Sequence, residues 1–128
     1  MNCFKVEEST LQNLLLKIEN LLNGINKEKR YKAMLVCDEI FTNQLKHGNF
    51  EDKIADIEFC LNFKDDDIIM TFRDNAKPFN PLKNTQPNLE TDLDETQLGG
   101  LGVFLVQQYT KTMEYTYKEK YNILKVWV

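Results

Sequence analysis

Two pairs of alternating segments constrain the fold of this chain more than any other feature. The segment IADIEFCLNF places apolar side chains on one side of an extended backbone, and DIIMTFRD resumes the alternation after the polar turn KDDD. A second pair, MEYTYK and NILKVWV, flanks a turn at Glu119–Tyr121. Because a period of two residues is typical of a strand with one buried face, the chain is predicted to form two antiparallel hairpins.

The other regular segments have helical periodicity. Leucines recur at helical spacing in STLQNLLLKIENLLNGIN, and a longer helix is expected from about Lys27 to His47. A short strand, CFKVEE, opens the chain, and VFLVQQYT predicts a short helix before the last hairpin. This order predicts an α/β (α+β) two-layer sandwich, in which helices cover one face of a mixed, mainly antiparallel sheet. We expect a single domain over residues 1–128.

Composition excludes several classes of protein. A net charge of −4 without a Lys/Arg-rich run argues against a nucleic-acid partner. No segment has the length and apolar character of a membrane span or a signal peptide, so we expect a cytoplasmic protein that does not bind membranes. Cys3, Cys37 and Cys60 are odd in number and widely spaced, which predicts free thiols in a reduced compartment rather than disulfides or a metal site.

The second helix carries a polar stripe. At about 100° per residue, its apolar residues fill an arc of about 180° that starts at Val36. Glu39, Asn43 and His47, spaced four residues apart, border this arc and would face a cleft at the edge of the core. A solvated helix flank that ends at Gly48 explains the same spacing. The stripe alone therefore leaves both interpretations open.

A long loop between Asn75 and Leu98 contains all three prolines and no glycine. Loops of this length in compact domains are usually functional lids or disordered linkers. At its end, three of the five glycines, Gly99, Gly100 and Gly102, open a helix, where backbone N–H groups attract phosphate. The segment lacks the Lys-Ser/Thr ending of a P-loop and the context of a dinucleotide-binding turn. A phosphate cradle and a plain turn both remain possible from these glycines alone.

The motifs are more specific in combination. ExxxNxxxHG lies on a helix, Asp74 ends a strand before xAxPFNP, and GGLGxFLV follows the loop. In this order they resemble the GHKL superfamily of ATP-binding domains, with a histidine-kinase-like ATPase fold. Within it, they resemble the small anti-sigma-factor serine/threonine kinases. The resemblance spans nearly the whole chain and implies an ATP lid at about residues 75–98.

The resemblance assigns roles to individual residues. Glu39 is implied as the general base, and Asn43 as the ligand of the Mg²⁺ that accompanies ATP. Asp74 is implied to accept a hydrogen bond from the adenine amino group, which guanine lacks at that position. The remaining nucleotide-binding positions implied are His47, Ala76, Phe79, Gly99, Gly100, Leu101 and Gly102.

The chain departs from the family pattern at Ala76, where the first glycine box normally has a glycine. A methyl group there would crowd a bound base or exclude a backbone with positive φ.

The resemblance implies an ATP-dependent serine/threonine kinase that phosphorylates a small STAS-like antagonist protein, binds a sigma factor and forms a homodimer. Two alternatives remain at this stage. One is a non-catalytic anti-sigma adaptor that senses ATP or does not require it; the other is a histidine-kinase catalytic domain or ATP hydrolase of the same superfamily. The chain carries both Glu39 and Asn43, which favours catalysis over an adaptor.

Overall fold

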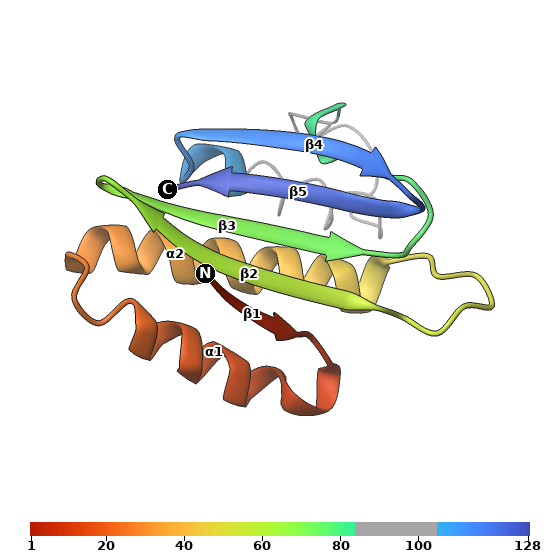
Figure 1. The fold of residues 1–128 in the computed structure, drawn as a ribbon, viewed down its shortest axis with the longest axis horizontal. Helices are drawn as coiled ribbons and strands as arrows, with labels where there is room; N and C mark the ends of the chain where they lie inside the picture. The colour runs from red at the N-terminus through yellow and green to blue at the C-terminus, as the bar shows by residue number, and fades with distance from the viewer. Residues whose placement is uncertain (84–104) are drawn as a thin grey trace, which may run out of the picture.

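The computed structural model describes residues 1–83 and 105–128. Its strands form one five-stranded sheet in the spatial order β1-β2-β3-β5-β4 (Figure 1). Their bounds are β1 Asn2–Lys5, β2 Ile57–Lys64, β3 Asp67–Asp74, β4 Thr112–Lys118 and β5 Tyr121–Trp127. The predicted sheet and both hairpins are confirmed, and every strand pair that the structure describes is antiparallel.

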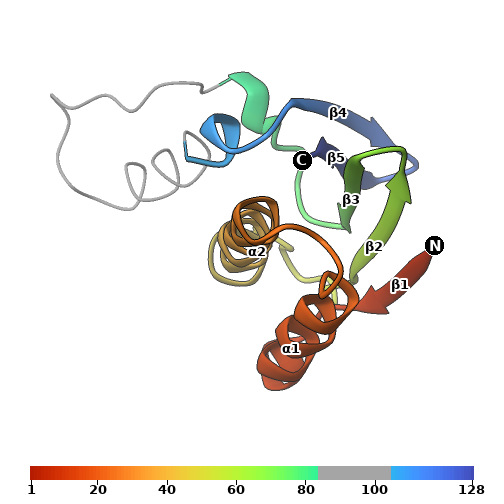
Figure 2. The same ribbon diagram turned by 90° about the vertical axis from the view of Figure 1, so that its left-hand side faces the viewer.

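Both long helices lie on the same side of this sheet, as predicted (Figure 2). The helical elements are η1 Glu8–Thr10, α1 Leu11–Leu21, α2 Lys27–Thr42, η2 Asn43–His47 and η3 Pro81–Lys83, and residues 105–108 are also helical. The side chain of Asn26 caps α2 by accepting a hydrogen bond from Lys29 N at 2.9 Å. Within the described part of the chain, none of the helices has the length and apolar character that crossing a membrane requires.

The core lies between the helices and the sheet. The predicted apolar arc of α2 is buried at Ala33, Val36, Cys37, Ile40 and Phe41. The ring of Phe41 contacts those of Phe59 on β2 and Phe72 on β3, with centroids 5.3 and 5.5 Å apart. Because offset and edge-to-face aromatic pairs add to the burial of apolar area, this cluster fixes α2 against the middle of the sheet.

The prediction of three free thiols is wrong for two of the cysteines. Cys3 of β1 and Cys60 of β2 are joined by a disulfide bond, whereas Cys37 is buried and free. The physical reason is strand register, since β1 pairs with β2 so that Cys3 lies directly opposite Cys60. The spacing of 57 residues along the sequence gave no indication of this contact.

Candidate functional site

The second helix changes its winding before it ends. Beyond Thr42 it continues as η2, a π-helical turn over Asn43–His47. The helix predicted through His47 is therefore confirmed, but its last five residues depart from the constant α-helical spacing that the pattern assumed. A π-turn carries more residues per turn than an α-helix and is frequent at functional sites. Glu39 and Asn43 are half-buried, as a stripe beside the core requires, and His47 is exposed.

Gly48 has an extended backbone directly after this helix. A Cβ atom at this position would collide with the backbone oxygen of Gln44 and with the ring of Phe50. Gly48 therefore ends the helix, as its sequence position predicted, because only a residue without a side chain fits there.

Asp74, the last residue of β3, is held by donors from three separate segments. Its Oδ2 accepts a hydrogen bond from Gln44 Nε2 on η2 at 3.1 Å. Its Oδ1 accepts from Ala76 N at 3.1 Å and from Asn122 Nδ2 on β5 at 2.9 Å. We call Gln44, Asp74, Ala76 and Asn122 the Asp74 network. These bonds fix the orientation of the carboxylate before any ligand arrives.

Asn122 is the centre of this network and is buried, with 7% of its surface exposed. Its Nδ2 also donates to the backbone oxygens of Ala76 and Lys77, at 3.0 and 3.2 Å. Its Oδ1 accepts from Phe79 N at 3.1 Å and from the Tyr115 hydroxyl. Burial raises the pKa of Tyr115, which favours the protonated hydroxyl that acts as this donor. One buried amide therefore shapes the loop from Ala76 to Phe79.

The same loop is tied on its other side to the segment that follows η2. Asn75 N donates to Asp56 O at 3.2 Å, and Asp56 N donates to Asn75 Oδ1 at 2.7 Å. Asn75 Nδ2 donates to Ile54 O at 2.9 Å, and Lys77 N donates to Asn49 O at 2.8 Å. The backbone that follows Asp74 is therefore held on one side by the segment after η2 and on the other by Asn122 of β5.

The structure brings some of the predicted site residues together. Through Gln44, the helix that carries Glu39 and Asn43 is hydrogen-bonded to Asp74. Ala76 is 5% exposed and Phe79 is 57% exposed. Gly99, Gly100, Leu101 and Gly102 lie outside the described residues, as does the predicted lid beyond residue 83.

Ala76 does not have the backbone conformation that its family counterpart suggested. In the described ranges, residues 1–83 and 105–128, the non-glycine residues with positive φ are Glu51, Asp65, Glu119 and Lys120, and Ala76 is not one of them. The side chain of Ala76 therefore causes no backbone strain from a positive φ. The expectation that a methyl group at this position would exclude the required backbone conformation is wrong. Whether the methyl group crowds a bound base stays a prediction.

Sequence reasoning missed Gln44 and Asn122, although each had a detectable signal. Gln44 follows Val36 by eight residues, so regular helical spacing already placed it on the apolar arc. Asn122 alternates with the buried Leu124 and Val126 of β5, which places an amide on the buried side of the sheet. A polar residue on a buried face needs hydrogen-bond partners, so both were candidates for a structured polar site.

The described residues fit a bound adenine nucleotide with Mg²⁺. Gln44 Oε1 is buried and has no hydrogen-bond partner within residues 1–83 and 105–128. It lies in the same network as the Asp74 carboxylate, so this site offers acceptors to a ligand that donates, as the adenine amino group does. The half-buried Asn43 carries the kind of hard oxygen atom that Mg²⁺ prefers.

Comparison with known proteins agrees with this geometry. The serine/threonine-protein kinase BtrW of Bordetella bronchiseptica is 25% identical over 95 residues, which cover 74% of this chain and 67% of that protein. The family model of the histidine kinase-like ATPase domain matches residues 4–127. Because this match covers almost the full length, the chain belongs to the histidine kinase-like ATPase domain family.

Proposed function

We propose that this protein is a serine/threonine kinase that transfers the γ-phosphoryl group of Mg·ATP to a small protein. The observation that carries the proposal is the hydrogen bond between Gln44 and Asp74. It joins the helix that carries Glu39 and Asn43 to the strand end that carries the adenine acceptor. One packed unit therefore carries the proton acceptor Glu39, the metal ligand Asn43 and the carboxylate of Asp74 that recognises adenine. Similarity to a kinase of this class supports the choice of substrate residue.

Each residue has one task in the proposed reaction. Asp74 accepts a hydrogen bond from the adenine amino group, and Asn43 holds Mg²⁺ through its side-chain oxygen. Glu39 accepts the proton of the serine or threonine hydroxyl as its oxygen bonds to the γ-phosphorus. The bond from that phosphorus to the β–γ bridging oxygen breaks, and ADP leaves. When bound, Mg²⁺ would neutralise negative charge on the phosphate groups.

The proposal includes a regulatory partner cycle. The phosphorylated protein is a STAS-like antagonist, a sigma factor is the second partner, and the kinase acts as a cytoplasmic homodimer. A phosphoryl group adds about two negative charges to the antagonist and disfavours its docking on an acidic kinase. With a net charge of −4, this chain would release the modified antagonist and remain free to hold the sigma factor.

The proposal is tested by transfer from γ-labelled ATP. Wild-type protein, Mg²⁺ and a purified STAS-like candidate are expected to give label on a serine or threonine of the candidate. Asn43→Ala is expected to lower the transfer rate by about tenfold or more, because it removes a contact to a charged group. The matched control is Lys46→Ala, an exposed position in the same π-turn, which is expected to transfer at the wild-type rate.

The assay also separates this function from its alternative. If wild-type protein binds ATP but labels no serine or threonine of any STAS-like candidate, the kinase proposal fails and a nucleotide-sensing adaptor is favoured. If Asn43→Ala transfers at the wild-type rate, Asn43 does not hold the metal ion.

A further inference from the structure

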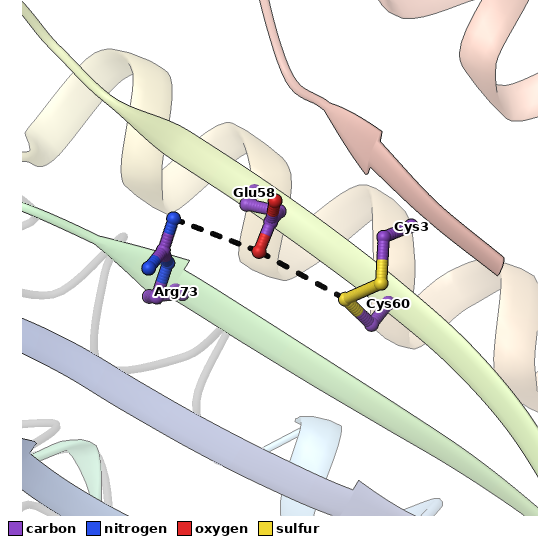
Figure 3. The surroundings of a disulfide bond; sticks show 4 residues. All are labelled: Cys3, Glu58, Cys60 and Arg73. Carbon is purple, nitrogen blue, oxygen red and sulfur yellow. Dashed lines mark hydrogen bonds and ion pairs between the residues drawn. A yellow bond between two sulfur atoms is a disulfide. The ribbon is translucent and has the colours of Figure 1, made fainter. Parts of the chain in front are cut away.

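The Cys3–Cys60 bond joins the edge strand β1 to β2 (Figure 3). The two residues face each other across β1 and β2, with Cα atoms 4.0 Å apart. In the same pairing, Phe4 lies opposite the fully buried Phe59 on the face covered by the helices. Because neighbouring residues of a strand point to opposite faces, both sulfur atoms lie on the face of the sheet opposite α1 and α2 (Figure 2). Cys3 is exposed and Cys60 is half-buried.

The strand that this bond attaches has few other attachments. β1 is four residues long, lies at the edge of the sheet and, among the strands that the structure describes, pairs with β2 alone. Asn2, Cys3 and Lys5 are exposed, and only Phe4 is half-buried. Lys5 forms an ion pair with Asp56, 2.7 Å apart, but the Lys5 side chain is 61% exposed and water screens the pair. The covalent bond is therefore the strongest link between this strand and the sheet.

The surroundings of the bond suit a thiol as well as a disulfide. Glu58 Oε1 lies 4.0 Å from the Cys60 sulfur, and Arg73 Nη2 lies 3.6 Å from the same carboxylate oxygen (Figure 3). A reduced Cys60 would donate its S–H to this carboxylate, which Arg73 keeps in place. Since the strand ladder holds Cys3 opposite Cys60, closing the bond again requires no rearrangement of the sheet.

We propose that Cys3 and Cys60 form a reversible redox pair that exchanges with glutathione and controls how firmly β1 is attached. In the closing direction, one thiolate attacks glutathione disulfide and releases one glutathione thiolate. The second cysteine thiolate then attacks the mixed disulfide and releases the other glutathione. The cysteine pair loses two electrons and two protons, and glutathione disulfide becomes two glutathione molecules.

The first test is a redox titration of the full chain. Protein is equilibrated in glutathione buffers from strongly reducing to strongly oxidising, quenched in acid, alkylated under denaturing conditions and weighed by mass spectrometry. Wild type is expected to lose two alkylation sites in a single step within this range. The proposal is overturned if the bond stays closed at the most reducing ratio, as a permanent structural disulfide would, or if both thiols stay free at the most oxidising ratio.

Matched variants assign the step to this pair. Cys3→Ser is expected to show no intramolecular step. Cys37→Ala is expected to titrate like wild type, because Cys37 is buried and burial raises the pKa of its thiol, which suppresses the reactive thiolate. If Cys3→Ser still lost two alkylation sites in a single step, the step would not belong to the Cys3–Cys60 pair.

The second test measures the attachment of β1 directly. Hydrogen exchange of the wild-type protein is compared in the oxidised and reduced states. The amides of β1 are expected to exchange at least about tenfold faster after reduction, and those of the central strand β3 at similar rates in both states. Equal rates for β1 in the two states would show that the bond does not control the strand.

Discussion

Replacement of Glu39 by glutamine is expected to lower the rate of phosphoryl transfer by about 10²- to 10⁴-fold, which is the range for loss of a general base. Glutamine has nearly the same shape and remains compatible with the half-buried position on α2, but it cannot accept the proton of the attacking hydroxyl. Single-turnover transfer from γ-labelled ATP measures the chemical step. ATP affinity, measured by calorimetry, is expected to stay within about twofold of wild type.

The matched control for this change is Asp38→Asn. Asp38 is the neighbouring acid on α2, but it is exposed, so it lies on the side of the helix away from the core. The variant loses the same charge and is expected to transfer at the wild-type rate. If Glu39→Gln also transfers within about twofold of wild type, Glu39 is not the general base and the kinase mechanism needs another proton acceptor.

Asn122→Ala is expected to lower the free energy of unfolding by about 3 kcal/mol, because it removes a hydrogen-bond partner from several part-buried or buried polar groups. The groups affected are Asp74 Oδ1, the backbone oxygens of Ala76 and Lys77, Phe79 N and the Tyr115 hydroxyl. Urea denaturation measures this loss. ATP affinity is expected to fall by about tenfold or more, since the carboxylate of Asp74 loses one of the donors that orient it.

Asn62→Ala provides the comparison for Asn122→Ala. Asn62 lies on β2 and is half-buried. It alternates with the buried residues Phe59 and Leu61, so its side chain points to the face of the sheet opposite the helices. Its replacement is expected to change the free energy of unfolding by less than about 0.5 kcal/mol. If the two variants were equally stable, Asn122 would not be the centre of the Asp74 network.

The fold could be predicted from the sequence because its main signals are local. Alternation in β2 and β3, and the apolar arc of α2, each arise within a few residues and require no knowledge of the rest of the chain. The change of winding after Thr42 could not be predicted, because the π-turn at Asn43–His47 alters a spacing that the pattern assumes to be constant.

The candidate site was predictable only in part, because its geometry depends on contacts distant in sequence. Asp74 was identified from its motif, yet its partners Gln44 and Asn122 are 30 and 48 residues away. Their presence on buried faces was a usable signal, but nothing local shows which group they bond. The Cys3–Cys60 contact was missed for the same reason, since it depends on the register between β1 and β2.

Calorimetric titration of the wild-type protein with Mg·ATP and with Mg·GTP tests the central claim most directly. The claim is that Asp74, fixed by Gln44 and Asn122, reads the amino group of adenine. ATP is expected to bind roughly 100-fold more tightly than GTP, because guanine has a carbonyl where adenine donates and would place one acceptor against another at the half-buried Asp74 carboxylate. Equal affinity for the two nucleotides, or no binding of ATP, would contradict the account.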